Sequence, residues 1–262
     1  MSTRLVALKP IPGTIAIAPG ATFIELDAER AALWVQSGHA RAECDVPIAE
    51  GWNGLDWKGA TVAILASGPS LTVEQCDAIR AWRGAARGRY VIAINTTFRR
   101  APWSDMLYAC DGEWFRAVDK ATGTRYIDEA TGVMGRSRMW TQDKSAADAF
   151  GLHYIASDRA PGLSRDPRRI NQGNNSGYQA INIAYHAGAK RMILLGFDCK
   201  PGHWHAPHPS PLSNRGPVDK WKRNFRGLAA DLEREGIEVV NCSPGTALTA
   251  FKVQPLADAL SR

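Results

Sequence analysis

The 262-residue sequence lacks the features that mark membrane, secreted and fibrous proteins. It has no run of about 18 or more apolar residues, the length that a membrane-spanning helix needs. Its N-terminus has no apolar core of the length that a secretory signal needs. Its five cysteines are widely spaced and include no CxxC pair, which is typical of reduced thiols rather than of a disulfide framework or a zinc knuckle. We therefore expect a cytoplasmic protein without a membrane span.

The excess of one charge sign is also small. The chain has 32 Lys and Arg residues against 26 Asp and Glu residues, which gives a formal net charge of +6. This balance permits an anionic partner without requiring one. Hydrophobic residues make up 45% of the chain, enough for a buried core, and this excludes disorder as the main state. The length fits one α/β domain with an appendage, or two small domains.

The first 59 residues differ in pattern from the rest of the chain. Two short β-like runs, at 14–18 and 22–26, flank a Pro-Gly turn signal, and Asp27 is a suitable N-cap for a short helix after them. Residues 47–58 are a polar linker with two tryptophans. We predict that residues 1–59 form a small β-β-α appendage with its linker.

From residue 60 onward, short apolar strands alternate with helical segments. The predicted strands cover residues 61–66, 90–94, 106–110, 137–141, 152–155, 191–195 and 237–241. The predicted helices cover residues 72–82, 113–120, 144–150, 176–186, 218–235 and 255–260. Continuous apolar strands in such an alternation indicate a parallel sheet that is buried on both faces. We therefore predict an α/β fold for residues 60–262, a Rossmann-like, doubly wound, mostly parallel sheet of about seven strands.

A candidate phosphate-binding turn follows the first strand of this domain. The strand leads into Ser67, Gly68, Pro69 and Ser70 and then into a helix, whose first N–H groups attract anions. Gly68 permits a tight turn. The turn has neither the GxGxxG fingerprint nor the GxxxxGK[ST] loop, which disfavours dinucleotide-binding and P-loop proteins. A plain strand–helix turn is the alternative.

Three polar residues follow predicted strands and are expected at one rim of the sheet. Asn95 ends the second strand, Asp111 ends the third, and Asp198 follows the strand at 191–195. The carboxyl ends of parallel strands converge on the crevice where open α/β sheets bind ligands. Asn95 suits a phosphate or a ribose, and Asp111 suits a ribose hydroxyl or a metal ion. The alternative role of Asp111 is to cap the helix that follows it.

A second candidate cradle opens the helix at 176–186. Asn175, Ser176 and Gly177 combine small polar side chains with exposed backbone amides, a composition suited to a phosphate. Gly177 also allows a ligand to approach the backbone closely.

Three histidines, His203, His205 and His208, lie in a proline-rich loop after Asp198. Imidazole titrates near neutral pH, so a general base is the better-motivated role. Zinc binding is the weaker hypothesis because the loop offers few further ligands, and we predict no metal site. Surface histidines packed on Trp204 are the bland alternative.

The order of these motifs resembles that of a known family. It is similar to the order in bacterial sialyltransferases that use CMP-sialic acid, and in related pterin diphosphokinase-like proteins. The motifs that carry the resemblance are, in chain order, strand–SGPSL–helix, strand–Asn, strand–Asp, NSG–helix–GAKRMILLGFD, the His loop and GIEVVNCSPGTAL. The resemblance extends from Thr61 to about Phe251. The segment GATFIELDAERAALWVQSGHA resembles a short module of bacteriophage proteins, which implies a phage or prophage origin.

The resemblance implies a role for each matching residue. The residues that it implies for the nucleotide phosphate and base are Gly68, Pro69, Ser70, Asn95, Ser176 and Gly177, with Asn175 beside them. It implies that His208, with His205 in reserve, deprotonates the acceptor. Ser67 and Asp111 stand where the sialyltransferases have Asn. A carboxylate at position 111 repels a donor phosphate unless Mg²⁺ intervenes, which favours the diphosphokinase-like alternative.

Three hypotheses follow from the sequence. The first is a nucleotide-dependent transferase that holds a nucleotide or nucleotide sugar at the strand ends, uses Asp198 and the histidines in catalysis, and modifies a small molecule, glycan or nucleic acid. The second is a Mg²⁺-dependent pyrophosphokinase-like enzyme. The third is a phage nucleic-acid-binding or DNA-modifying protein with a basic footprint from Arg83, Arg87, Arg89, Arg99, Arg100, Lys220, Lys222, Arg223 and Arg226. A homo-oligomer is compatible with each hypothesis.

An arginine-rich segment at 157–175 is the longest predicted loop. Loops of this length in compact domains are usually functional lids or disordered. We expect its arginines to close over the phosphates, and they are Arg159, Arg165, Arg168 and Arg169. A solvated loop is the alternative.

Overall fold

The computed structural model describes residues 3–7, 22–25, 40–42, 52–212 and 217–262. The chain divides into two compact units, Met1–Gly54 and Leu55–Arg262. The division falls close to the boundary that the sequence pattern places after residue 59.

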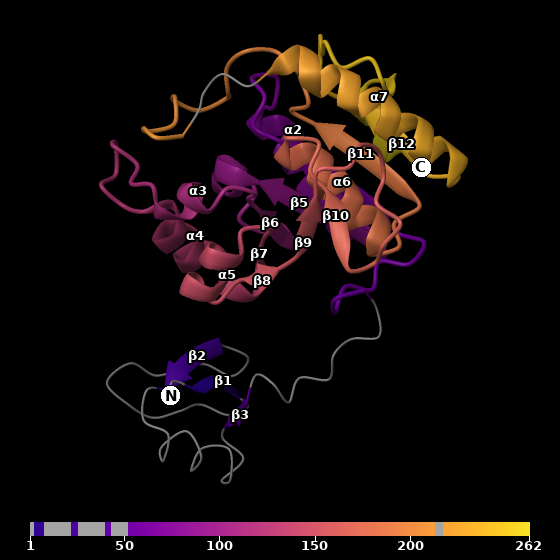
Figure 1. Ribbon diagram of the computed structural model, residues 1–262. Coiled ribbons are helices and arrows are strands. Elements are labelled where there is room, and N and C mark those ends of the chain that lie inside the picture. Colours follow the sequence, from indigo (N-terminus) through magenta and orange to yellow (C-terminus); the bar gives the residue numbers. More distant parts are fainter. Residues whose placement is uncertain (1–2, 8–21, 26–39, 43–51, 213–216) are drawn as a thin grey trace. The chain divides into compact units, whose positions relative to one another are not determined.

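In the described part of the first unit, three short strands form an antiparallel sheet (Figure 1). The central strand is β1 (Thr3–Ala7), and its neighbours are β2 (Thr22–Glu25) and β3 (Ala40–Ala42). β2 coincides with a predicted strand, whereas the sequence pattern did not indicate β1 or β3. The predicted strand at 14–18 and the predicted helix after Asp27 lie outside the described residues.

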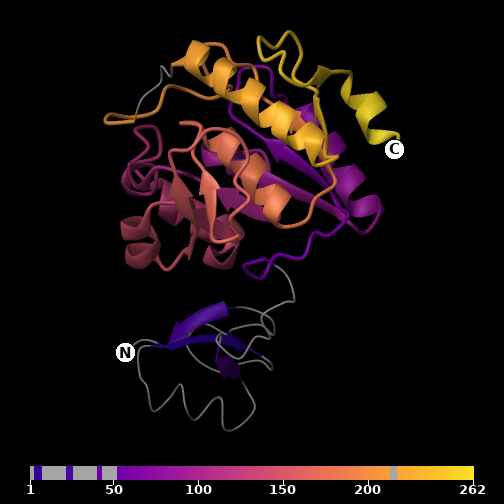
Figure 2. The same cartoon turned by 45° about the vertical axis from the view of Figure 1, so that its right-hand side comes forward.

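The second unit is built on one sheet of eight strands, in which every neighbouring pair is parallel (Figures 1 and 2). In spatial order the strands are β13 (Lys252–Val253), β12 (Glu238–Asn241), β11 (Arg191–Leu195), β4 (Thr61–Leu65), β5 (Arg89–Ile94), β6 (Met106–Tyr108), β7 (Met139–Thr141) and β8 (His153–Tyr154). This arrangement confirms the predicted Rossmann-like α/β fold. The short strand β13 extends it beyond the predicted strands.

The helices of the second unit follow the predicted alternation, with one addition. They are α2 (Val73–Ala85), α3 (Gly112–Arg116), α4 (Tyr126–Met134), α5 (Lys144–Phe150), α6 (Ser176–His186), α7 (Val218–Arg234) and α8 (Leu256–Leu260). α4 was not predicted. The helix expected at 113–120 ends at Arg116, because Ala117 has extended backbone dihedral angles. No helix in the described ranges is long and apolar enough to cross a membrane.

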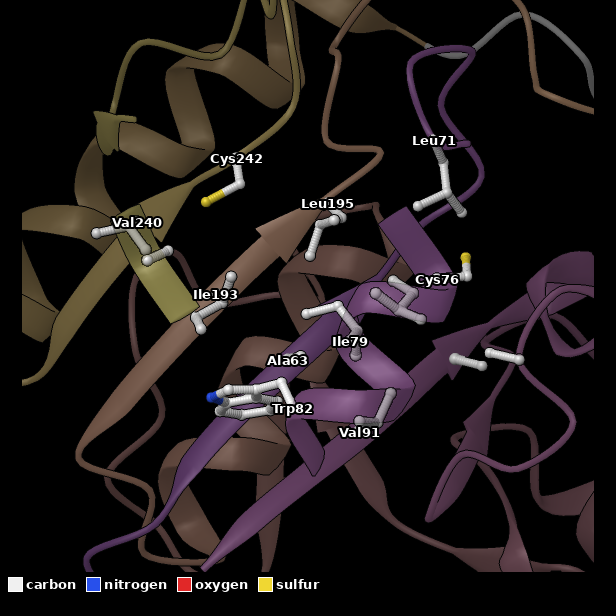
Figure 3. Packing of buried hydrophobic residues seen from close by; sticks show 14 residues of the cluster. Ala63, Leu71, Cys76, Ile79, Trp82, Val91, Ile193, Leu195, Val240 and Cys242 are labelled. Atoms are coloured by element: carbon white, nitrogen blue, oxygen red, sulfur yellow. The ribbon is translucent and has the colours of Figure 1, made fainter. Parts of the chain in front are cut away.

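The adjacent inner strands β4 and β11 are buried on both faces, which explains their continuous apolar sequence. On one face, side chains of β4, β5, β11 and β12 pack against α2 and α8. Figure 3 shows Ile79 and Trp82 of α2 over Ala63 and Ile193 of the sheet. α6 and α7 cover the opposite face (Figure 2). The side chains of β4 and β11 are therefore buried up to the carboxyl ends of these strands.

The strand order reverses between β4 and β11. From β4 the chain proceeds through β5 and β6 toward one edge, and it returns to pair β11 on the other side of β4. This reversal is the topological switch point, where the connections leave a crevice at the carboxyl ends of the strands.

The arginine-rich segment contains regular structure. β9 (Ala156–Asp158) and β10 (Arg169–Asn171) pair in parallel as a separate two-stranded sheet. Part of the segment at 157–175 is therefore β-strand, where the sequence predicts a long loop without regular structure.

Candidate active site

A cavity of about 710 Å³ opens at the switch point. Its walls come from the turn after β4, the ends of β5 and β6, the start of α6, the segment after β11 and the start of α7. The predicted site residues that line it are Ser67, Gly68, Asn95, Asp111, Asn175, Ser176, Gly177, Asp198 and His208. Pro69, Ser70 and His205 are not among its lining residues. The three predicted rim residues, Asn95, Asp111 and Asp198, thus line the same cavity.

Backbone strain is concentrated at this cavity. Asn95, Asn174 and Cys199 line it with φ values of 50°, 55° and 45°, in the left-handed region that non-glycine residues seldom adopt. Asn53 is the other described non-glycine residue with positive φ, and it lies elsewhere. Strained residues persist where the surrounding structure holds them, and they cluster at functional sites. The strain therefore marks this cavity as the candidate site.

Gly68 is required by close packing rather than by its backbone angles. Its N–H donates to the Gly196 carbonyl at 3.0 Å, so the turn after β4 touches the turn after β11. A Cβ atom at position 68 would overlap the Asp198 carboxylate and the Gly196 carbonyl. The sequence predicts that Gly68 permits a tight turn, whereas the structure requires glycine here because the two strand ends are in close contact.

Asp198 is buried and holds the turn after β4. Its Oδ2 atom accepts hydrogen bonds from the Ser70 hydroxyl at 2.9 Å and the Ser70 N–H at 3.3 Å. The carboxylate thereby binds the Ser70 N–H group, one of the backbone donors that the sequence predicts for a phosphate. Both Ser70 and Asp198 have a structural role here, and their predicted ligand and catalytic roles stay predictions.

The start of α6 is also capped by the chain itself. The Asn175 side-chain oxygen accepts hydrogen bonds from the N–H groups of Gly177 at 2.9 Å and Tyr178 at 3.1 Å. The Ser176 hydroxyl donates to the Cys110 sulfur at 3.1 Å. Burial raises the pKa of the Cys110 thiol well above its usual range, so it stays protonated. A phosphate at this helix start must compete with the Asn175 side chain.

Two side chains of α7 fix the turn that precedes α6. The Trp221 indole N–H donates to the Asn174 carbonyl at 2.6 Å, and the Asn224 amide donates to the Gly173 carbonyl at 2.9 Å. Gly173 and Asn174 both have positive φ. Side chains of α7 therefore hold the turn at Gly173 and Asn174 in its left-handed conformation.

Asp111 is exposed at the cavity and precedes α3. It occupies the N-cap position but makes no side-chain capping hydrogen bond. The Gly112 N–H is instead bound by the Asp143 carboxylate at 3.2 Å. Asp111 is therefore the N-cap residue by position, as the alternative predicts, but its carboxylate binds no N–H group of α3.

The three histidines of the proline-rich loop form a compact cluster. Their ring centroids lie 4.9 Å apart for His203 and His205, 4.6 Å for His205 and His208, and 5.1 Å for His203 and His208. His203 and His208 line the cavity, and His205 packs against the edge of Trp204. The alternative in which the histidines pack on Trp204 thus describes His205.

The cluster is neutral at physiological pH. Burial, followed by the neighbouring imidazoles of His205 and His203, lowers the pKa of His208 to about 3. Burial likewise lowers the pKa of His205 to about 4, and it also lowers the pKa of His203. His203 Nδ1 and His205 Nε2 are buried without a hydrogen-bond partner in the described ranges.

The cluster is not arranged as a metal site. The His203 and His205 rings lie within 3° of parallel, and stacked rings cannot direct their in-plane lone pairs to one point. Among residues 52–212 and 217–262, no group of three or more His, Cys, Asp or Glu side chains is arranged to hold a metal ion.

The described lining residues of the cavity carry a slight negative charge. Asp111 and Asp198 line it, and Lys200 is the one Lys or Arg side chain among its described lining residues. The arginines expected as a lid do not line it. Three of them pair with carboxylates of the same chain: Arg165 with Glu235, Arg168 with Asp166, and Arg169 with Asp158. Arg159 is exposed.

Much of the predicted nucleic-acid footprint is also engaged within the chain. Arg83 pairs with Asp105 and Arg99 with Glu129, while Lys222 pairs with Asp219. The side chains that stack on tryptophan rings are Arg89, on Trp82, and Arg100, on Trp204. Five of the nine residues of the predicted footprint therefore contact side chains of the same chain.

A second cavity of about 420 Å³ shares Cys110, Asp111 and Leu212 with the first. Its other lining residues include Glu113, Gln142, Asp143, Ser157 and Gln172. This lining is rich in hydrogen-bond acceptors and amides. Asp111 thus stands where the two spaces meet.

The lining residues that the sequence did not single out include Cys110, Lys200 and Trp221. Cys110 and Lys200 flank predicted rim residues, so a wider window around the strand ends would have included them. Trp221 lies three residues after Val218 and four before Phe225, on the apolar stripe of α7.

Comparison with known protein families finds no family model that matches the sequence, and comparison with curated proteins finds no significant match. The candidate site is therefore interpreted from its own geometry.

Proposed function

We propose that the protein is a nucleotide-dependent transferase, similar in kind to the sialyltransferases, with its nucleotide in the switch-point cavity. The observation that carries this proposal is the strained polar lining of a cavity at the reversal of strand order, formed by Asn95, Asn174 and Cys199. Open α/β sheets bind nucleotides at this place. The cavity volume lies within the range of small-molecule sites.

His208 is the proposed general base. It lines the cavity, whereas His205 lies behind it against Trp204. Burial lowers the pKa of His208 to about 3, so its ring nitrogen is unprotonated at neutral pH but is a weak base in the free protein, and the role requires a ligand that raises this pKa. An anionic ligand beside the ring stabilises the imidazolium and raises its basicity during the reaction.

The transfer step requires one proton acceptor and one leaving group. An acceptor hydroxyl oxygen attacks the donor carbon, the bond from that carbon to the nucleotide phosphate breaks, and His208 takes the hydroxyl proton. The second cavity, with its carboxylates and amides, suits the hydroxyl-rich acceptor. Asp111 borders both spaces and would contact both substrates.

Calorimetric titration of the full chain with CMP, CDP, UDP and ATP, with and without Mg²⁺, tests the proposal. We expect at least one of these nucleotides to bind. The variant Asn95→Gly removes a cavity side chain at a position whose left-handed backbone glycine accepts, and it should weaken binding roughly tenfold. Asn53→Gly is the matched control at the left-handed position away from the cavity, and it should bind as the parent chain does. Absence of binding by every nucleotide contradicts the proposal.

A Mg²⁺-dependent pyrophosphokinase-like enzyme is the second candidate. The observation that favours it is the charge of the described lining residues, among which Asp111 and Asp198 outnumber Lys200. Mg²⁺ is usually held by one or two carboxylates together with substrate phosphates, and it would offset this charge. Transfer from ATP that stops on addition of EDTA would support this candidate, and an unchanged rate would exclude it.

A further inference from the structure

Trp221 combines a fixed position with a place on the cavity wall. It lies in the first turn of α7, on the same side of the helix as Val218 and Phe225, and all three line the cavity. Its indole N–H is engaged by the Asn174 carbonyl at 2.6 Å. This hydrogen bond fixes the ring beside the left-handed turn that precedes α6.

The ring of Trp221 differs in its contacts from the rings of five other tryptophans, and it differs from Trp103 in lining the cavity rather than packing on the apolar core. Ring contacts with an aromatic side chain or an arginine are made by Trp57, Trp82, Trp114, Trp140 and Trp204. No aromatic or arginine side chain of the described ranges makes such a contact with Trp221. The side chain is half-buried, and its edge, rather than its face, makes the hydrogen bond. An indole ring thus lines the cavity with no aromatic or arginine side chain of the described ranges on its face.

We infer that Trp221 is the stacking platform for the base of the bound nucleotide. The inference rests on the proposed function and names the part of the ligand that this wall recognises. Aromatic side chains stack on any nucleobase, because every base has a π face. The hydrogen bond to Asn174 holds the indole in place before the ligand arrives, so little side-chain freedom is lost on binding.

The test separates the base from the rest of the nucleotide. The full chain and the variants Trp221→Leu, Trp221→Phe and Asn224→Ala are titrated with CMP, AMP and ribose 5-phosphate. Trp221→Leu should weaken CMP and AMP binding roughly 10- to 100-fold and change ribose 5-phosphate binding less than about threefold. Trp221→Phe keeps a ring and should retain most of the affinity for both nucleotides. Asn224→Ala removes the other hydrogen bond to the same turn and is the matched control for turn distortion.

Each outcome decides between defined alternatives. Equal losses for CMP and ribose 5-phosphate in Trp221→Leu would overturn the inference, since the ring would then hold the turn or the sugar. Asn224→Ala with the same base-dependent loss would overturn it as well. If the parent chain binds no nucleotide, the proposed function fails and the inference fails with it, which is a distinguishable result.

A spectroscopic measurement covers the case in which Trp221→Leu does not fold. The chain has nine tryptophans, so labelling with ¹⁵N-tryptophan gives a small set of indole signals, and Trp221→Phe identifies the one from Trp221. CMP should shift this signal strongly, because a stacked base adds a ring current, whereas ribose 5-phosphate should not. Equal shifts with both ligands would overturn the inference.

Discussion

The Asp198 carboxylate, after β11, accepts both the hydroxyl and the backbone N–H of Ser70, in the turn after β4. The two residues are 128 positions apart in sequence. Their contact joins the ends of the two strands at which the sheet order reverses, and Asp198 itself lines the candidate site. One wall of the site is thus held by a part-buried pair of hydrogen bonds.

Replacing Asp198 should destabilise the second unit. Asp198→Ala leaves the Ser70 N–H and hydroxyl without their acceptor, and we expect a loss of about 2–3 kcal/mol in the free energy of unfolding. Urea unfolding followed by circular dichroism measures this loss. Asp77→Ala, at an exposed position of α2, is the control and should change stability by less than about 0.5 kcal/mol. Equal stabilities of the two variants would contradict the structural role of Asp198.

The same substitution at two glycines should have opposite effects. Gly68→Ala places a Cβ atom against Asp198 and Gly196 and should destabilise the chain by at least about 2 kcal/mol. Gly84→Ala in α2 meets open space and should stabilise it by about 0.5–1 kcal/mol, because alanine favours a helix. Thermal unfolding of both variants checks the pair. A stable Gly68→Ala chain would show that the two strand ends are not in close contact.

The histidine cluster should make stability depend on pH. Its folded-state pKa values lie below the value of about 6.5 in the unfolded chain, at about 3 for His208 and about 4 for His205. Below pH 6.5 the unfolded chain therefore binds more protons than the folded chain, so stability falls as the pH is lowered.

We expect Tm to decrease from pH 7 to pH 5 by on the order of 5 °C. The double variant His205→Asn, His208→Asn should show a smaller decrease, since asparagine does not titrate. Differential scanning calorimetry at pH 7, 6 and 5 measures both chains. Identical pH dependence in the two chains would argue against a neutral cluster.

Removing the proposed base should affect turnover more than binding. His208→Gln keeps a polar side chain but has no accepting imidazole, and it should lower kcat by roughly 10²–10⁴-fold. Nucleotide affinity should change less than about threefold. His205→Gln is the control from the same cluster and should lower kcat less than about tenfold. A larger loss in His205→Gln than in His208→Gln would exchange their roles.

Mg²⁺ should strengthen the binding of a triphosphate through Asp111. We expect ATP to bind at least about tenfold more tightly with millimolar Mg²⁺ than with EDTA, because the cation offsets the cavity carboxylates. Asp111→Asn should remove most of this difference, which titration calorimetry measures. Asp77→Asn, at an exposed position of α2 that lines neither cavity, is the matched control and should keep the difference. An unchanged Mg²⁺ effect in Asp111→Asn would contradict the role of Asp111.

Local signals predicted the elements that carry strong caps and apolar runs. α5 and α6 have the predicted limits, because Asp143 and Asn175 supply side-chain caps at their starts. α4 has no side-chain cap hydrogen bond at Arg125 and contains Gly132, so little in the sequence distinguishes it from a loop. β13 is two residues long and exists through its pairing with β12, a contact that has no local signature.

The rim of the site could be predicted because parallel strands place all their carboxyl ends at one edge. The hydrogen-bond partners of each rim residue could not be predicted, because those partners lie far away in the sequence. Asn175 and Asp198 look like ligand groups in the sequence, and each is occupied by backbone N–H groups of the folded chain. Trp221 looks like one more apolar residue of an amphipathic helix, and its place on the cavity wall follows from the position of α7.

The pairing of β4 with β11 has a consequence for synthesis of the chain. β4 is complete at residue 65, but the strand that covers one of its edges begins at residue 191. At typical rates of translation the ribosome needs roughly 10 s to make the intervening segment. Throughout this interval an apolar strand edge is open to wrong pairing, and unpaired edges of this kind promote aggregation. Nascent chains that stop before residue 191 should therefore depend on chaperones, and the cavity becomes complete only late in synthesis.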